Sequence, residues 1–314
     1  MKKLARIATT SLATLEPYSP PYNLSEPDPA ATFARGLALI DAAGAQHADL
    51  VCLPETFAAA GLHSTRVADL AEPIDGPFFT ALAERARANR INVVAGAFLK
   101  VDGRVDNVAV LFGRDGALIG TYAKRHPTEG EIEGGVTPGT AAGVFETDIG
   151  RIGLAICFDL NWHELWAEMK AQRADIVAWI SAYEGGFPLQ AYAWMHDFVV
   201  VSSVQSYTAK IIDRSGRVLT NTSRWGRLVS ADIDLDQRWF HTDGQAEAIL
   251  AVQQRYGDRV RVETRGEEHL FTISRLDPSL SLDALVTEMG LVELDAYLAR
   301  CTAAQERSRR RGDA

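Results

Sequence analysis

The sequence predicts an α/β fold in one large domain, followed by a C-terminal extension. Short apolar segments alternate with segments of helical periodicity through the first 242 residues, and no clear linker interrupts them. The composition is 47% hydrophobic and 23% charged, which suffices for a buried core and excludes a mainly disordered chain. We expect an α/β domain over residues 1–242 and an extension over residues 243–314 that packs on the domain or on a partner subunit.

The expected strands are short apolar runs, several of which end on a polar residue. Asp-Gly pairs at residues 102–103 and 115–116 mark turns between strands, and Ser-Gly at 215–216 marks another. In chain order, the domain strands are expected at residues 4–12, 49–55, 91–99, 118–123, 151–157, 175–181, 198–204, 209–212, 218–221 and 229–235. The extension is expected to contain a hairpin at residues 260–264 and 269–274.

The expected helices lie between these strands. An alanine-rich helix is expected at residues 30–47, and a second helix follows the Asp-Gly-Pro turn at 75–77 and runs over 78–90. Residues 17–29 hold five prolines and are expected to form an extended loop. The remaining helices are expected at residues 162–172, 189–197 and 245–256, with one or two more in 282–305.

Charge and cysteine content exclude several classes of protein. Lys and Arg number 32 against 41 Asp and Glu, so the net charge of −9 argues against nucleic-acid binding. Cys52, Cys157 and Cys301 cannot form a disulfide framework, which fits a reducing compartment. No apolar run reaches the roughly 18 residues that span a membrane. Because Arg6 interrupts the first apolar run, we interpret it as a strand rather than a signal peptide and expect a cytoplasmic protein.

Three chemically compatible side chains follow expected strands. Glu55, Lys124 and Cys157 each come directly after an apolar run, and ligands of α/β proteins gather at the carboxyl ends of strands. A thiol can act as a nucleophile, a carboxylate as its base and an ammonium as a stabiliser of developing negative charge. Taken singly, each has an ordinary structural interpretation, and Cys52 and Cys301 are expected to be structural.

The residues after Cys157 predict a helix start. Asn161 is a favourable N-cap and Glu164 lies three residues later, which is the spacing of a capping box. A helix would then begin at Trp162 and place Cys157 near its positive end. With Lys124 nearby, this position is expected to favour the thiolate.

Together these segments resemble the nitrilase superfamily of carbon–nitrogen hydrolases, in its amidase and carbamoylase branch. Residues 53–57 (Leu-Pro-Glu-Thr-Phe) resemble the segment with the family's base, 122–128 the segment with its lysine, and 153–159 the segment with its nucleophile. The resemblance extends over about residues 3–235. It identifies Glu55, Lys124 and Cys157 as the expected catalytic residues.

The resemblance also implies a second catalytic glutamate after the lysine. Glu129, Glu131 and Glu133 are the candidates, and the family pattern favours Glu131, with Glu133 second. The alternative is that these acids form a solvated loop. We expect Glu131 to orient Lys124 and the substrate amine.

The mechanism implied by the resemblance passes through an acyl-cysteine. Glu55 would take the proton of Cys157, and the thiolate would attack an amide or nitrile carbon. Lys124 and the backbone N–H of Phe158 would stabilise the anion. Ammonia would leave, and water activated by Glu55 would release a carboxylic acid. No metal ligand cluster and no phosphate-binding loop is found in the sequence, so no cofactor or metal is expected.

The resemblance implies a four-layer α–β–β–α sandwich, with two sheets face to face and helices outside. It also implies a homodimer or a higher homo-oligomer. Trp162, Trp166 and Met169 recur near one helical turn and are either an exposed interface stripe or residues that pack on the sheet.

The substrate is expected to be a small amide or N-carbamoyl compound, with a nitrile as the alternative. The arginine with which many carbamoyl-amino-acid hydrolases of the family bind a carboxylate is missing from residues 160–163. Phe158-Asp159 resembles the amide-cleaving branch, whereas Pro127-Thr128 resembles nitrile-cleaving members. The candidate substrate-binding residues are Phe158, Trp162, Tyr183 and Glu184.

Other classes of function remain as alternatives. An acyl transferase would use the same acyl-cysteine and pass the acyl group to an amine. A binding protein without catalysis would leave Cys157 unreactive. A glutaminase subunit would need a synthetase partner, and no ATP-binding segment follows the region of resemblance.

Overall fold

The computed structural model describes residues 4–12, 28–60 and 69–312. The chain divides into two compact units, Met1–Ile233 and Asp234–Ala314. The boundary expected at residues 242–243 lies within the second unit. Most of the proline-rich segment 17–29 falls outside the described residues.

The first sheet of the larger unit has six strands within the described residues, in the order β12-β1-β2-β3-β4-β5. Strands β1 to β3 are parallel, and β3 to β5 are antiparallel. Their bounds are β1 Leu4–Thr10, β2 Leu50–Cys52, β3 Asn92–Val101, β4 Arg104–Phe112, β5 Leu118–Ala123 and β12 Leu228–Asp234.

The second sheet repeats this plan, in the order β11-β10-β9-β8-β7-β6 for the described part of the chain. Its centre, β7 to β9, is parallel, while β6, β10 and β11 are antiparallel to their neighbours. The strands are β6 Gly143–Thr147, β7 Gly150–Ile156, β8 Ile176–Ser181, β9 Val199–Val204, β10 Lys210–Ile212 and β11 Val218–Asn221. The expected strands of both sheets are therefore confirmed, with small shifts at their ends.

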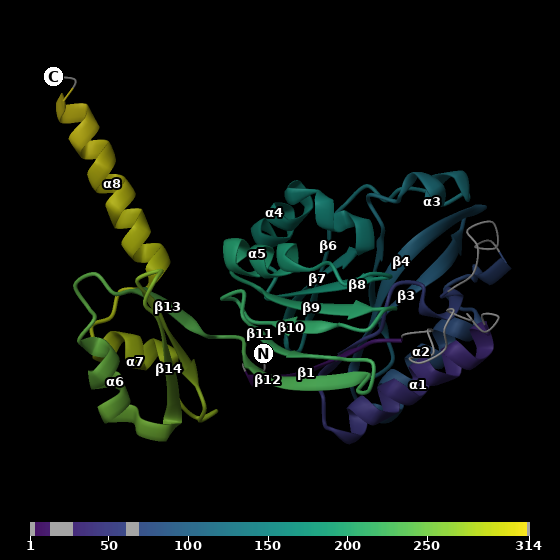
Figure 1. Ribbon diagram of the computed structural model, residues 1–314, viewed down its shortest axis with the longest axis horizontal. Coiled ribbons are helices and arrows are strands. Elements are labelled where there is room, and N and C mark those ends of the chain that lie inside the picture. The colour runs from purple at the N-terminus through teal and green to yellow at the C-terminus, as the bar shows by residue number, and fades with distance from the viewer. Residues whose placement is uncertain (1–3, 13–27, 61–68, 313–314) are drawn as a thin grey trace. The chain divides into compact units, whose positions relative to one another are not determined.

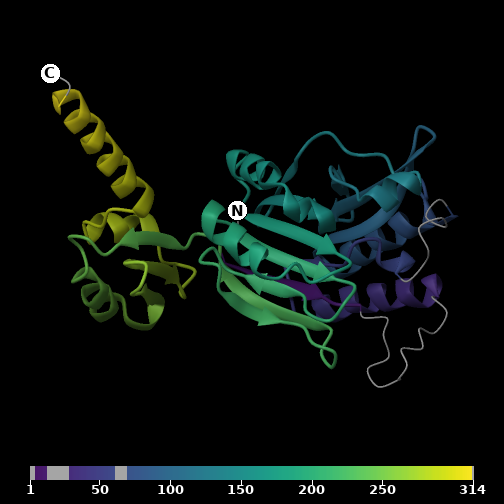
Figure 2. The ribbon, with the colours of Figure 1, turned by 45° about the horizontal axis from the view of Figure 1, so that its top comes forward.

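The two sheets face each other, and helices cover their outer sides (Figures 1 and 2). Strand β1 contacts β9 and β10, β3 contacts β8, and β4 contacts β7 across the interface. Helices α1 (Pro29–Ala45) and α2 (Pro77–Asn89) bury Ile40 and Leu82 with Val93 of β3 on the first sheet. Helices α4 (His163–Ala171) and α5 (Phe187–His196) lie beside the second sheet. This is the expected α–β–β–α sandwich.

Local sequence explains where the first two helices begin. The carboxylate of Asp28 accepts the N–H of Ala31 and caps α1, and Pro29 occupies the first turn, where its missing N–H costs nothing. Pro77 opens α2 in the same way, and the helix ends at Asn89, followed by Arg90 in a left-handed conformation.

The helix expected over residues 162–172 is confirmed with a start one residue later, but its predicted N-cap, Asn161, was wrong. The helix begins at His163, and residues Cys157–Asn161 form a short 3-10 turn. The side chain of Asn161 donates to the carbonyl of Phe158 and so does not act as the predicted N-cap. Asp159 explains the difference, because its buried carboxylate binds the N–H of Ile156 and ties the turn to neighbouring segments.

The exposed stripe considered for α4 is also absent. Trp166 and Met169 are fully buried. The Trp166 ring stacks on Tyr192 of α5 at 4.3 Å, and Met169 packs against Gly153 of β7. The alternative, that the residues pack inward, is confirmed for Trp166 and Met169, whereas Trp162 is half-buried and stacks on His126.

The smaller unit has a core of its own. Its three strands, β13 (Arg238–His241), β14 (Val260–Arg265) and β15 (Leu270–Arg275), form an antiparallel sheet in the order β13-β15-β14. The predicted hairpin is thus confirmed. Its helices are α6 (Ala248–Tyr256), α7 (Leu282–Glu288) and α8 (Leu294–Gly312). Phe240, Phe271, Ile273, Leu282 and Leu285 form the centre of its core.

Across residues 4–12, 28–60 and 69–312, no helix combines the length and apolar character that a bilayer span requires.

Candidate active site

Three of the expected side chains follow strands of the two facing sheets. Glu55 comes after β2 and Lys124 after β5 of the first sheet, whereas Cys157 comes after β7 of the second. Their exposed fractions are only 5%, 1% and 9%, respectively. Three buried ionisable groups at strand ends are costly unless they are paired, so their partners define the site.

Lys124 lies between two carboxylates. Its Nζ donates to Glu55 Oε1 at 2.8 Å and to Glu131 Oε1 and Oε2 at 2.9 and 2.7 Å. Burial lowers the pKa of Lys124, but its interactions with Glu55, Cys157 and Glu131 outweigh burial and raise it. The lysine therefore stays cationic at neutral pH.

Glu131 is held in place by its own short helix, α3 (Glu129–Glu133). The Thr128 hydroxyl accepts the N–H of Glu131, and the N–H of Thr128 donates to Glu131 Oε2 at 2.8 Å, which forms a capping box. Burial raises the pKa of Glu131, but Lys124, the Thr128 N–H and Asn107 together lower it by more, so the net pKa is below the usual value. Glu129 and Glu133 are exposed, and Glu131 is the one on Lys124.

Glu55 also connects the two sheets. Its Oε2 accepts the N–H of Ala182, which follows β8 of the second sheet, at 3.0 Å. The carbonyl of Glu55 accepts from the side chain of Gln205, which follows β9, at 2.7 Å. The carboxylate is therefore positioned from both sides of the interface.

Cys157 occupies a strained turn. Its φ of 48° lies in the left-handed region, which is unfavourable for a side chain with a β-carbon. The indole N–H of Trp179 donates to its carbonyl at 3.0 Å. The sharp turn takes the chain out of β7 directly at the thiol.

The resting thiol is protonated. Burial and the charge of Glu55 raise the pKa of Cys157 to about 12, against smaller lowering effects of Lys124, Ser181 and the Ala182 N–H. The expected preference for a thiolate is not supported, because burial and the charge of Glu55 outweigh Lys124 in their effect on the pKa of Cys157. The thiol needs a base before it can attack.

Asp159 joins the loop after Lys124 to the turn after Cys157. Its carboxylate is fully buried and accepts from the Tyr122 hydroxyl at 2.7 Å and from the backbone N–H of His126 at 2.9 Å. The His126 ring also bonds to Asp159 at 2.9 Å and stacks on Trp162. Asp159 therefore fixes the spacing between the lysine and thiol segments.

The expected substrate-binding residues differ in exposure. Phe158 and Tyr183 are exposed, whereas Trp162 and Glu184 are half-buried. Burial raises the pKa of Tyr183 to about 12, and electrostatic interactions with Cys157 and Glu55 add to the effect, so this ring lies near both groups. Glu184 Oε1 accepts the N–H of Tyr207 at 3.4 Å.

Sequence reasoning missed four contributors: Asn107, Ser181, the N–H of Ala182 and Gln205. Asn107 had a sequence signal, because it is a polar residue inside the apolar run of β4. Its side chain donates to both Glu55 and Glu131. The Ala182 N–H and Gln205 contact Glu55 across the two sheets, and Ser181 acts on Cys157 from the neighbouring strand, so no local sequence pattern reveals them.

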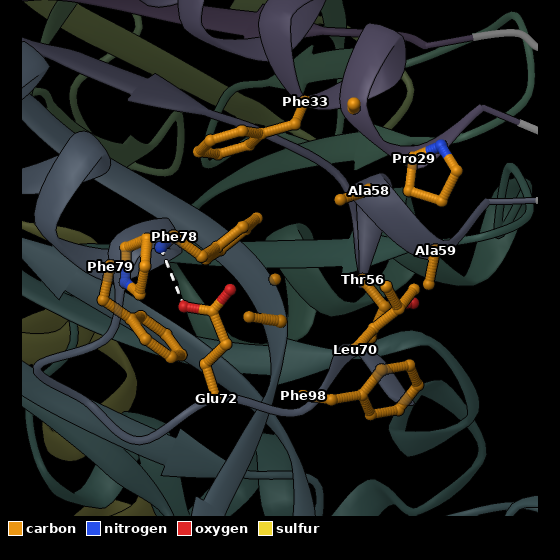
Figure 3. Close-up of a pocket in the computed structure, with 14 residues that line it drawn as sticks. Pro29, Phe33, Thr56, Ala58, Ala59, Leu70, Glu72, Phe78, Phe79 and Phe98 are labelled. Carbon is orange, nitrogen blue, oxygen red and sulfur yellow. Dashed lines mark hydrogen bonds between the residues drawn. The ribbon is translucent and has the colours of Figure 1, made fainter. Parts of the chain in front are cut away.

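A separate cavity lies under α1 and α2 (Figure 3). It has a volume of about 260 Å³, and the aromatic rings of Phe33, Phe78 and Phe98 line it. Glu72 supplies a carboxylate, one oxygen of which accepts the N–H of Phe78 at 2.9 Å. Thr56, which follows Glu55 in the chain, is part of the cavity lining. Lys124, Glu131 and Cys157 do not line the cavity.

Among the described residues, no group of three His, Cys, Asp or Glu side chains gathers in a way that could hold a metal ion.

The fold and the site together define a class of protein. A sandwich of two sheets, with a glutamate, a lysine and a cysteine at its strand ends, is typical of thiol hydrolases of the nitrilase superfamily. A sequence profile described as carbon-nitrogen hydrolase matches residues 11–238. The chain belongs to the carbon–nitrogen hydrolase family of the nitrilase superfamily and is an enzyme that hydrolyses non-peptide carbon–nitrogen bonds.

Individual relatives agree with this assignment. Omega-amidase NIT2 of Bos taurus is 30% identical over an alignment of 232 residues, and the match covers 64% of this chain and 82% of the relative. An amidase from Nesterenkonia sp. has a TM-score of 0.64 at 19% identity and covers 80% of this chain and 97% of its own. Nit3 of Saccharomyces cerevisiae has a TM-score of 0.62 at 20% identity, over 81% of this chain and 95% of its own. The two structures support the fold.

Proposed function

We propose that this carbon–nitrogen hydrolase is a thiol amidase that cleaves a small amide or N-carbamoyl compound and releases ammonia. In this proposal Cys157 is the nucleophile, Glu55 the base, Lys124 the stabiliser of the anion and Glu131 the residue that orients the lysine. The observation that carries the proposal is the chain of buried contacts from Glu131 through Lys124 to Glu55 beside a protonated thiol.

The first half of the reaction forms an acyl-enzyme. Because the pKa of Cys157 is about 12, the thiol gives its proton to Glu55 as sulfur attacks the amide carbon. The carbonyl oxygen becomes negative and is stabilised by the ammonium of Lys124, with the backbone N–H of Phe158 as a second donor. One such donor typically lowers the barrier by about 3 kcal/mol. The carbon–nitrogen bond then breaks, Glu55 protonates the leaving nitrogen, and ammonia departs.

The second half hydrolyses the thioester. Glu55, again a carboxylate, takes a proton from water as the water oxygen attacks the acyl carbon. The carbon–sulfur bond breaks, the thiolate recovers the proton from Glu55, and a carboxylic acid leaves. Over the whole cycle Glu55 alternates between the protonated and the ionised form, whereas Lys124 stays charged. This fits a carboxylate that lies where the two sheets meet and a lysine whose pKa is raised.

An amide substrate is favoured over a nitrile. The relative from Bos taurus reported above is named omega-amidase, and one structure of the Nesterenkonia amidase carries the acetamide moiety of fluoroacetamide added at its active-site cysteine. The feature that favoured nitriles was Pro127-Thr128. Thr128 caps α3 and holds Glu131, so this pair has a positioning function that does not depend on a nitrile.

Around this centre, we propose that Phe158, Trp162, Tyr183 and Glu184 contact the substrate. Tyr183 is supported by the effect of Cys157 on its pKa. Phe158 and Trp162 form an aromatic edge, with ring centroids 5.2 Å apart, next to the nucleophile. Glu184 would favour a substrate with a positive charge.

The test is ammonia release from a panel of aliphatic and aromatic amides, carbamoyl amines, carbamoyl amino acids and matched nitriles. Wild-type enzyme is compared with Cys157→Ala, and Cys52→Ala is the matched control. We expect turnover of amides or carbamoyl compounds that disappears only in the first variant. Turnover mainly of nitriles would establish the alternative substrate class. Amide formation from an added amine acceptor would identify an acyl transferase.

We further propose a homodimer or higher homo-oligomer that forms through α5. This outer helix exposes Phe187, Trp194 and Met195, with exposed fractions of 74%, 39% and 63%. Their spacing of seven and eight residues places them on one helix face. A row of large exposed apolar side chains favours association.

For the compartment, we propose the cytoplasm. Cys52, Cys157 and Cys301 are all free thiols in the structure. Free thiols persist in a reducing environment.

A further inference from the structure

Asn107 is a buried asparagine in the middle of β4. Its exposed fraction is 1%, and its backbone pairs with Phe98 of β3. The carbonyl of Asn107 accepts the N–H of Lys124 at 2.8 Å. The backbone of Asn107 therefore fixes the point at which β5 ends and the lysine begins.

The side chain of Asn107 binds both site carboxylates. Its Nδ2 donates to Glu55 Oε1 and to Glu131 Oε1, each at 2.8 Å. These are two of the oxygens that also accept from Lys124 Nζ. The amide and the ammonium thus hold the same pair of carboxylate oxygens, and the four side chains form a closed ring of hydrogen bonds.

A neutral donor is suited to this position. Glu55 and Glu131 bring two negative charges into a buried site, and Lys124 supplies one positive charge. An amide NH₂ has two N–H groups and adds two hydrogen bonds without adding charge. A second cation would instead neutralise the site and weaken Glu55 as a base.

The amide orientation follows from its partners. Carboxylates accept and do not donate, so the NH₂ end must face Glu55 and Glu131. Oδ1 of Asn107 is left buried with no hydrogen-bond partner among the described residues. By contrast, Asn92 at the start of β3 is buried to the same 1%, and its side chain donates to the Asp49 carbonyl and to the Asp148 carboxylate.

We infer that Asn107 is a positioning residue of the reaction, which fixes Glu55 and Glu131 against Lys124 so that Glu55 meets the thiol in one orientation. This inference rests on the proposed function. Because Oε1 of Glu55 is held by Asn107 and Lys124, and Oε2 faces the Ala182 N–H, the carboxylate cannot rotate. Without Asn107 both glutamates lose a donor at once.

The test compares Asn107→Leu and Asn107→Asp with Asn92→Leu as the matched control, on the best substrate of the panel. The leucine variant keeps the volume and removes both donors. We expect kcat to fall on the order of 10²-fold with little change in KM. We also expect the acid limb of the pH profile to move to higher pH, because the Asn107 N–H lowers the pKa of Glu131. Asn92→Leu is expected to reduce thermal stability without moving the acid limb.

Asn107→Asp keeps the shape and serves if the leucine variant fails to fold. It places a third carboxylate beside two others at neutral pH, and we expect its activity to rise as the pH is lowered and the new group becomes protonated. Equal pH profiles for wild type, both Asn107 variants and Asn92→Leu would overturn the inference. Full activity of Glu55→Gln and Cys157→Ala would instead overturn the proposed function, whatever the Asn107 variants show.

Discussion

At the scale of single residues, Glu55 and Cys157 oppose each other in the resting enzyme. The carboxylate raises the pKa of the thiol, yet the same carboxylate is the proposed acceptor of the thiol proton. A thiol with a pKa of about 12 is almost fully protonated at neutral pH, which limits adventitious oxidation and alkylation. In the proposed mechanism, the thiol therefore loses its proton to Glu55 as sulfur attacks the substrate carbon.

This opposition gives a prediction for Glu55→Gln. Removing the negative charge removes one cause that raises the pKa of Cys157, so the thiolate titration should move to lower pH. Turnover should fall at the same time, because the base is gone. Thiolate absorbance is measured against pH in a Cys52→Ala/Cys301→Ser background, with ammonia release in parallel. A titration that moves upward or stays fixed would show that Glu55 does not act on the thiol.

At the scale of elements, α3 depends on its cap. The helix has five residues, too few to be stable alone, and Thr128 satisfies the N–H of Glu131. Thr128→Ala should destabilise the protein by about 1 kcal/mol and loosen Glu131 from Lys124, so kcat should fall. Thr128→Ser keeps the hydroxyl and should restore both properties. Chemical denaturation and steady-state kinetics measure the two effects; equal kinetics for the alanine and serine variants would contradict the prediction.

The exposed face of α5 gives a prediction about assembly. Met195→Glu places a charge in the apolar row, and burying that charge in an interface is unfavourable. We expect a smaller species in light scattering after size exclusion. Gln253→Glu adds the same charge on α6 and is the control. An unchanged mass for Met195→Glu would exclude α5 as the interface.

The same scale shows how far sequence reasoning reaches. Strand ends were predictable, because apolar runs are local, and they located Glu55, Lys124 and Cys157. The cap of α4 was not predictable. The turn before the helix is held by the carboxylate of Asp159, which accepts from the hydroxyl of the distant Tyr122 and from the Ile156 N–H. Asn107 was visible as a polar residue in a strand, yet its partners come from two distant segments. The local sequence pattern therefore predicts where strands and helices lie, whereas the function of a single side chain depends on contacts between elements that are distant in the sequence.

At the scale of the whole molecule, the chain divides at residues 233–234. All the hydrogen bonds described for the site join residues in the range 55–207, which belongs to the first unit. The second unit has its own sheet and its own apolar core. Each unit therefore has the internal contacts expected of an independent folding unit.

Truncation after Leu235 tests this division. The shortened chain keeps β12 and every site residue, so we expect a cooperative thermal transition and turnover close to that of the full chain. Calorimetry and ammonia release measure the two properties, and scattering compares the masses. Loss of turnover with an intact transition would show that the second unit contributes to the site. Fewer protomers per particle than in the full chain, with unchanged turnover, would show that the second unit contributes to assembly.

The bond between Glu55 and the Ala182 N–H has a consequence for how the enzyme acquires activity. One sheet supplies the base and the lysine, and the other supplies the thiol and the donor that orients the base. Neither sheet alone holds a complete site. During refolding, helices and strands can therefore reach native content while the enzyme remains inert, and turnover begins only when the two halves dock. The recovery of turnover during refolding therefore reports the docking of the two sheets and not the formation of secondary structure.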